Sequence, residues 1–70
     1  MRRYLVVIEK AEGNYSVYSP GLPGCVATGE TPNEARENMR AAIEMHLAGL
    51  QEDGLPVPEP TATAEYCTYG

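Results

Sequence analysis

The residues best suited to nucleophilic chemistry are Cys25 and the single histidine of the chain, His46. A thiol becomes a strong nucleophile when a neighbouring base takes its proton, and histidine is a common base. Nothing in the sequence around His46 predicts a group that would orient its ring for this task. Cys25 and Cys67 form no C-x-x-C motif, so they indicate neither a zinc site nor a disulfide framework. We expect no catalytic residue, no metal site, no cofactor and no Cys25–Cys67 disulfide.

The charge of the chain favours a basic protein as partner over a nucleic acid. Ten acidic and five basic residues give this 70-residue chain a formal net charge of −5 at pH 7. Such a field repels a phosphate backbone and accelerates encounter with a basic surface. We therefore expect no direct binding of nucleic acid through this chain.

Neither a leader nor a membrane span is predicted. Arg2 and Arg3 are followed by only five apolar residues, which are too few for a signal peptide. No apolar run approaches the roughly 20 residues that cross a bilayer. These observations predict a cytoplasmic protein that does not contact a membrane.

The strongest structural signal is a helix bounded by Thr31 and Gly54. Thr31 and Glu34 form a capping box, in which each side chain accepts a hydrogen bond from the other residue's backbone N–H. Pro32 fits the first helical position, Gly54 supplies a left-handed end, and Pro56 prevents continuation. Apolar spacing of three and four predicts one buried stripe, made of Ala35, Met39, Ile43, His46, Leu47 and Leu50.

Strands are predicted on both sides of this helix. Residues 4–9 are rich in β-branched side chains and are apolar on both faces, which indicates a central strand. Residues 15–19 alternate as a second strand, and residues 25–28 form a short third strand. After an extended proline-rich segment at 55–60, the Thr- and Tyr-rich residues 61–69 are predicted as a fourth strand.

These elements predict one α/β (α+β) domain over residues 1–70 with the order β-β-β-α-β. The first three strands form an antiparallel meander, and a right-handed crossover places the fourth strand beside the first. The sheet order is then 3-2-1-4. Because so short a chain buries only about 60% of its unfolded surface, we expect a homo-oligomer, either a dimer or a tetramer.

Several residues are candidates for contact with a protein partner. Leu5 and Val7 point to the sheet face that the helix leaves bare, and Met45 lies on a weak second stripe of the helix. The loop 20–24 holds two prolines and two glycines, so its backbone is shaped for fixed contacts. The contact candidates in the loop are Leu22, Pro23 and Gly24, and the acidic candidates for a basic partner are Glu9, Glu12, Glu52 and Asp53. The simpler alternative for Met45 and for the acids is a solvated surface.

Two polar residues near the helix stripe are expected to be structural. Asn38 lies at the edge of the stripe, where its amide can brace the irregular 22–25 loop. His46 lies within the stripe, which predicts a partly buried ring held by a hydrogen bond, with a partner contact as the alternative.

The sequence resembles the N-terminal domain of the HicB antitoxin family along nearly its whole length. The matching motifs are Tyr15-Ser16-Val17-Tyr18, Leu22-Pro23-Gly24-Cys25-Val26-Ala27-Thr28-Gly29, Thr31, Glu34-Ala35, Asn38, Ala42-Ile43, His46-Leu47, Glu52-Asp53-Gly54, Pro56 and Pro58. The resemblance implies a truncated ribonuclease-H-like fold with the order 3-2-1-4. It also implies a protein that binds and silences a small basic HicA-type mRNA-cleaving toxin, usually within an oligomer.

Departures from the family pattern narrow this expectation. Gly21 stands where the family usually has aspartate, and no DNA-binding C-terminal domain follows, so operator binding is not expected of this chain. One alternative function is an orphan oligomeric protein-binding module. Another is a divergent metal-dependent nuclease, which needs several carboxylates around two metal ions. The apolar centre of the first strand lacks such a carboxylate, Glu9 lies beyond it, and Glu44 lies opposite the apolar stripe, so we expect no enzyme.

Overall fold

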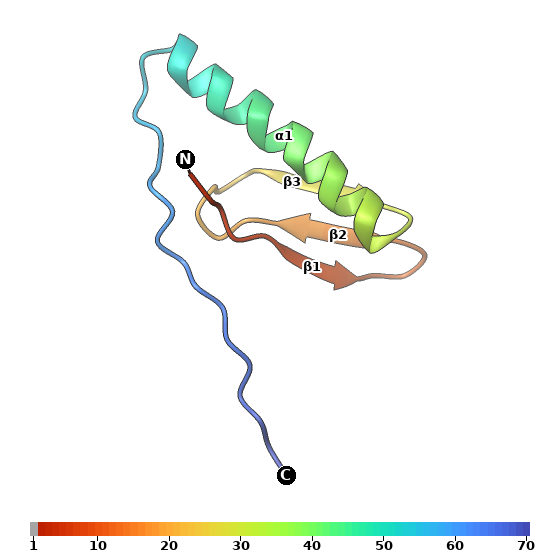
Figure 1. Ribbon diagram of the computed structural model, residues 1–70. Helices are drawn as coiled ribbons and strands as arrows, with labels where there is room; N and C mark the ends of the chain where they lie inside the picture. Colours follow the sequence, from red (N-terminus) through yellow and green to blue (C-terminus); the bar gives the residue numbers. More distant parts are fainter. Residues whose placement is uncertain (1) are drawn as a thin grey trace.

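A computed structural model of the protein describes residues 2–70 as a small sheet crossed by one long helix (Figure 1). Strands β1 (Val7–Lys10), β2 (Tyr15–Tyr18) and β3 (Val26–Gly29) precede helix α1 (Pro32–Glu52). The strands pair antiparallel in the order β1-β2-β3, and α1 lies across one face of the sheet. The predicted α+β class and the three-stranded meander are confirmed.

The start of α1 follows the predicted cap with one difference. Thr31 is the N-cap, and its side-chain oxygen accepts a hydrogen bond from the Glu34 N–H at 3.0 Å. The Glu34 carboxylate accepts from the backbone N–H of Glu30 at 2.8 Å, one residue before the N–H predicted for a capping box. An otherwise unpaired amide is satisfied in either case, so the start of the helix remains well defined.

The end of α1 is also where the sequence places it. Gly54 adopts a φ of 69°, the left-handed conformation that ends helices. The Gly54 N–H donates to the Gln51 carbonyl at 3.1 Å, and the Leu55 N–H donates to the Leu50 carbonyl at 2.8 Å. These two bonds form a Schellman motif, which satisfies carbonyls that the helix leaves unpaired.

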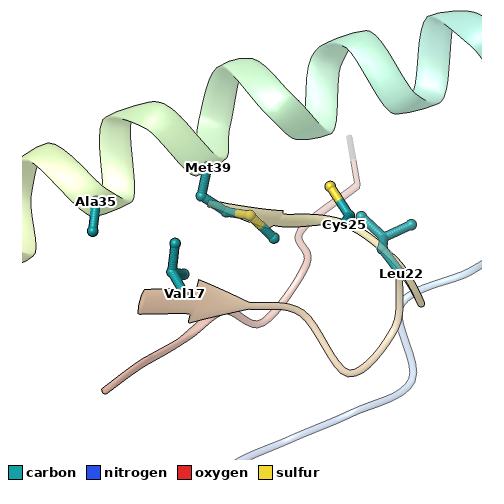
Figure 2. Packing of buried hydrophobic residues seen from close by; sticks show 5 residues of the cluster. All are labelled: Val17, Leu22, Cys25, Ala35 and Met39. Atoms are coloured by element: carbon teal, nitrogen blue, oxygen red, sulfur yellow. The ribbon is translucent and has the colours of Figure 1, made fainter. Parts of the chain in front are cut away.

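The buried core is small and lies between the first half of α1 and the middle of the sheet. Figure 2 shows its members: Val17 from β2, Leu22 and Cys25 from the loop before β3, and Ala35 and Met39 from α1. Half-buried apolar side chains surround this cluster; they are Tyr4, Val6, Tyr15, Ala27, Ala42, Ile43 and Leu47. The core therefore depends on a few contacts between α1 and β2 and on the folded loop.

Gly29 permits the close approach of β3 to the start of α1. A Cβ atom at this position would lie 2.4 Å from the backbone nitrogen of Ala35 and 2.8 Å from its Cα. Backbone atoms of a helix cannot move aside as the end of a flexible side chain can. The residue that ends β3 must therefore be glycine for steric reasons.

The first strand is shorter than predicted and lies at an edge rather than in the centre. Residues 4–6 precede β1 outside the ladder. There the Ser19 hydroxyl donates to the Leu5 carbonyl at 2.7 Å, while Pro20 has no N–H to extend the pairing. The central strand is β2, since no fourth strand among residues 2–70 pairs with β1.

The fourth strand predicted at 61–69 is not formed, which corrects the sheet order from 3-2-1-4 to 3-2-1. The Tyr4 hydroxyl donates to the Pro58 carbonyl, and Arg2 pairs with Glu59 at 3.6 Å, so the tail begins beside the residues that lead into β1. The prolines at 56, 58 and 60 remove alternate ladder donors, and residues 61–70 then run away from the sheet, fully exposed (Figure 1). The ribonuclease-H-like assignment that the resemblance implied stays a prediction.

The two cysteines are unpaired, as predicted, and they differ in environment. Cys25 is buried and Cys67 is exposed. Burial raises the pKa of the Cys25 thiol from its usual value, which keeps it in the unreactive protonated form. We expect a maleimide to label Cys67 rapidly and Cys25 roughly tenfold or more slowly, because labelling of Cys25 needs a local opening of about 1.4 kcal/mol or more.

Mass spectrometry of the labelled protein over time measures both rates, and a Cys67→Ser variant assigns them. Equal rates at the two thiols in the folded protein would contradict the burial of Cys25. In 6 M urea the difference should disappear, since unfolding removes the protection.

Candidate protein-binding surface

The sheet face turned away from α1 carries a row of apolar side chains. Val17 points toward α1 and is buried, so its neighbour Tyr18 points to the other face. Val7 lies directly opposite Tyr18 across the β1–β2 ladder, and Val26 lies opposite Tyr18 across the β2–β3 ladder. Aligned in this way, the three side chains form one row across all three strands.

The next row on the same face is polar. Glu9 lies opposite Ser16, and Ser16 lies opposite Thr28. The uncovered face therefore changes from apolar to polar between one row and the next row on that face, two residues along each strand. This gives an apolar contact area with a polar border.

The apolar row continues around the β3 edge to the helix. Val26 lines a hollow of about 240 Å³ together with Gly24, Cys25, Ala42, Met45 and His46. Met45 is 77% exposed, Val26 is 66% exposed and Tyr18 is 42% exposed. We call the surface made of Val7, Tyr18, Val26 and Met45 the apolar belt. Exposed apolar surface of this kind is typical of sites that bind another protein.

Two of the four belt residues were among the contact candidates named from the sequence, and two were not. The sequence singled out Val7 and Met45, and the structure brings them onto one continuous surface through Val26. Tyr18 and Val26 could have been predicted from strand alternation. Each directly follows a buried residue, Val17 or Cys25, and successive side chains along a strand point to opposite faces of the sheet. Leu5, in contrast, is half-buried and lies on the tail side of β1, where it lines a hollow with Ala62, Thr63 and Ala64.

The loop before β3 contributes fewer contact candidates than predicted. Leu22 is completely buried, so its side chain belongs to the core and is removed from the contact set. Two turn bonds fold the loop inward: the Leu22 N–H donates to the Ser19 carbonyl and the Cys25 N–H donates to the Leu22 carbonyl, both at 3.1 Å. Pro23 and Gly24 remain exposed at the rim of the belt.

Asn38 is structural, but it braces a different element from the one predicted. Its side-chain amide donates to the Thr28 carbonyl of β3 at 2.8 Å, not to the 22–25 loop. The loop satisfies its own backbone through turns, while the outer edge of β3 needs a donor.

Replacing Asn38 with alanine should lower the free energy of unfolding by about 1 kcal/mol, the usual net value of one such hydrogen bond. Urea denaturation followed by circular dichroism measures the change. An Asn33→Ala variant is the matched control, because the Asn33 side chain accepts a hydrogen bond from Arg36 on the exposed helix surface. Equal losses in the two variants would show that the Thr28 contact contributes nothing specific.

His46 is half-buried in the hollow and does not have the environment of a catalytic base. Among residues 2–70 its ring has no hydrogen-bond partner, which corrects the expectation of a bonded ring. Cys25 lines the same hollow, but its raised pKa is opposite to the lowered value that activates a thiol. Within the described part of the chain, no group of three His, Cys, Asp or Glu side chains could hold a metal ion.

The four acidic candidates do not form one surface. Glu9 and Glu12 lie at the β1–β2 hairpin, and the start of α1 lies nearby, since Ile8 shares a hollow with Pro32 and Arg36. Glu52 and Asp53 lie at the other end of α1, about 30 Å away for a 21-residue helix. These four charges are therefore spread around the molecule, and of the four Glu9 lies nearest the belt, two residues along β1 from Val7. Between residues 2 and 70, no helix is both long and apolar enough to cross a membrane.

Comparison with known proteins gives a consistent family assignment. The profile of a family described as HicB-like antitoxin of bacterial toxin–antitoxin systems matches residues 4–69. An uncharacterised 14.9 kDa protein of Haemophilus phage HP1 is 36% identical over 63 residues, which cover 90% of this chain and 47% of the phage protein. This chain thus spans about half of that relative.

Two UPF0150 proteins match larger shares of their own length. One from Helicobacter pylori is 45% identical over 49 residues, covering 70% of this chain and 68% of the relative. One from Thermoplasma acidophilum is 38% identical over 61 residues, covering 86% and 88%. No solved structure is significantly similar to this chain.

Proposed function

Because the chain belongs to the HicB-like antitoxin family, we propose that it is a cytoplasmic antitoxin that binds and inhibits a small basic HicA-type mRNA-cleaving toxin. The observation that carries this proposal is the family match over residues 4–69, which includes every strand and the whole helix. Inhibition is by covering the surface of the toxin. It requires no catalysis and no metal ion.

The apolar belt supplies the contact in this proposal. Tyr18 lies in its centre, flanked by Val7 and Val26 on the neighbouring strands. Tyrosine and methionine bury large areas at interfaces, and a tyrosine hydroxyl can still find a polar partner there. Because the belt lies largely on a rigid sheet, little conformational entropy is lost when it binds.

Net charge supports association with a basic protein. At −5 the chain attracts a cationic partner from a distance, and the distribution of acids around the molecule suits steering better than a single ion-pair site. The association rate should fall by roughly tenfold or more between low salt and 0.5 M salt, while the dissociation rate changes less. Surface plasmon resonance over a salt series measures both rates.

The deciding experiment adds this chain to the product of the neighbouring small basic reading frame in an RNA cleavage assay. We expect excess of the chain to stop cleavage, and we expect the inhibition to survive EDTA. A bovine serum albumin control at equal mass excludes non-specific protection of the RNA. Cleavage at the full rate in the presence of excess chain rules out the antitoxin and favours the orphan protein-binding module.

Self-association is a separate part of the proposal. With five buried apolar residues between positions 2 and 70, the core is small, and the belt and the exposed tail remain uncovered within one chain. A second copy would stabilise the fold by covering surface that water otherwise contacts.

A further inference from the structure

The two edges of the sheet are unequal: the β3 edge has a carbonyl that is bonded by a helix side chain, whereas no group of residues 2–70 bonds to the outer edge of β1. Helix α1 packs chiefly over β3, and the Asn38 side-chain amide donates a hydrogen bond to the Thr28 carbonyl at that edge. Few contacts join α1 to β1, which is the strand farthest from the helix (Figure 1). An uncovered edge strand is a template for pairing with another strand.

The backbone groups at the open edge can be assigned from the register. The Ala11 N–H donates to the Asn14 carbonyl at 2.8 Å, which closes the hairpin with a hydrogen-bonded pair. In an antiparallel ladder, bonded and non-bonded pairs alternate. Glu9 is therefore bonded to β2, whereas Ile8 and Lys10 direct their N–H and C=O groups away from the sheet.

The tail from Thr61 to Tyr69 has the composition of a strand and no partner in its own chain. It holds three threonines, two tyrosines, no proline and no glycine, and Glu65 is its only charged residue. Tyr66 is fully exposed and Tyr69 is 90% exposed. Among residues 56–70, no backbone N–H donates to another backbone group. A β-prone, nearly neutral segment is therefore exposed and makes no strand ladder with residues 2–60.

The path of the tail directs it away from its own β1. The Tyr4–Pro58 and Arg2–Glu59 contacts hold the start of the tail beside residues 2–4. A hollow of about 500 Å³ then separates residues 62–64 from residues 3–6, and the chain continues away from the sheet (Figure 1). Nine extended residues reach about 30 Å, well beyond the roughly 13 Å length of β1.

We propose that residues 61–69 pair with the open β1 edge of a second copy of this chain, and that the second copy returns its own tail to the first. Each sheet then has a fourth strand supplied by the partner. Exchange of identical elements is a low-cost route to a symmetric dimer. The near neutrality of the tail permits close pairing of two chains that each carry a charge of −5.

The occupant is a second copy for physical reasons. The contact is made by backbone groups, so it does not need the basic surface that a toxin would supply. The inference deepens the proposed self-association and does not depend on inhibition of a toxin, so each can fail without the other.

The test uses two versions of the full chain, distinguished by mass, in which Cys25 is replaced by alanine. The acceptor carries Lys10→Cys at the open edge together with Cys67→Ser, and the donor keeps Cys67 in the tail. After the two are mixed, unfolded and refolded, a short bis-maleimide is added and the products are analysed by mass spectrometry. We expect acceptor–donor dimers as the main cross-linked product.

Two matched chains make this result specific. An acceptor with Thr28→Cys places the thiol at the β3 edge, where Asn38 already bonds the Thr28 carbonyl, and should give several-fold less product. A single chain that carries both Lys10→Cys and Cys67 distinguishes exchange from a strand formed within one chain. Predominant cross-linking within that chain at low protein concentration, or equal yields at the two edges, would overturn the proposal.

Sedimentation provides a second measurement that does not depend on cross-linking. The wild-type chain should have the mass of two chains at micromolar concentration, and a Glu65→Pro variant should have the mass of one. Proline removes a ladder donor, and Glu65 is exposed and makes no ion pair with residues 2–70, so the fold of a single chain should be unchanged by circular dichroism. A Glu65→Pro chain that keeps the two-chain mass would contradict exchange of the tails.

Discussion

Gly29→Ala is expected to lower the free energy of unfolding by about 3 kcal/mol or more, a large share of the total for a domain of this size. The added methyl carbon would lie 2.4 Å from the Ala35 nitrogen, 2.8 Å from the Ala35 Cα and 2.9 Å from the Glu34 carbonyl carbon. All three are backbone atoms of the first turns of α1, so relief requires the whole helix to move away from β3. Such overpacking costs about 3 kcal/mol or more. The total stability of a 70-residue domain is only about 4–10 kcal/mol.

Gly49→Ala is the matched control for this prediction. Gly49 lies within α1, and a Cβ atom there would have open space around it. The same chemical change should therefore stabilise the protein by about 0.5–1 kcal/mol, because alanine favours a helix over glycine. Urea denaturation of both variants measures the two changes. A Gly29→Ala protein with the wild-type midpoint would mean that β3 and α1 do not meet as described.

The double variant Tyr18→Ser, Val26→Ser should lose most of its affinity for the toxin. These are adjacent residues at the centre of the apolar belt, on neighbouring strands. Truncating a central aromatic anchor typically costs about 2–4 kcal/mol, which is roughly 30- to 1,000-fold in Kd. Serine changes no charge, so electrostatic steering and its salt dependence should remain while the dissociation rate rises.

The matched control changes the polar row on the same sheet face. Ser16→Ala, Thr28→Ser alters two neighbouring residues one step along the strands and should change Kd by less than about threefold, as expected for rim positions. Isothermal titration calorimetry with the toxin gives both constants, and circular dichroism checks that each variant is folded. If the control loses as much affinity as the belt variant, the contact lies elsewhere on the sheet.

The helix was predictable from sequence because its signals are local. Thr31, Pro32 and Gly54 act on the backbone within one turn of their own position, so their effect does not depend on the rest of the fold. The one local error is the hydrogen bond to the Glu34 carboxylate, whose donor is the N–H of Glu30 and not that of the next residue, Thr31. The antiparallel meander followed similarly from short turns between neighbouring strands.

The edge position of β1 and the absence of a fourth strand were not predictable in the same way. Whether residues 61–69 pair depends on a long-range path set by Tyr4 and Pro58, which are 54 positions apart. Propensity alone indicated a strand there, and tertiary context overrode it. The apolar character of both faces of the segment from Leu5 to Ile8 predicted a central strand, and the structure places β1 at the edge of the sheet instead.

The candidate surface was predicted in part. Alternation placed Val7 outward correctly, because side-chain direction in a strand has a fixed period. Side-chain direction in a loop has no such period, so the sequence alone could not predict whether the Leu22 side chain is buried or exposed. The link between Met45 and the sheet depends on Val26 lying at the β3 edge, which requires knowledge of how α1 crosses the sheet.

The hydrogen bond from Asn38 to Thr28 determines where a growing sheet must stop. A fibre of stacked strands needs two open edges on every subunit, one to receive and one to offer. Here the Asn38 amide already occupies the outward Thr28 carbonyl of β3, so the β3 edge offers one acceptor fewer than the β1 edge. Reciprocal exchange uses both tails and both β1 edges of a pair, so no free tail or free β1 edge is left to recruit a third chain, and assembly by tail exchange terminates at a pair.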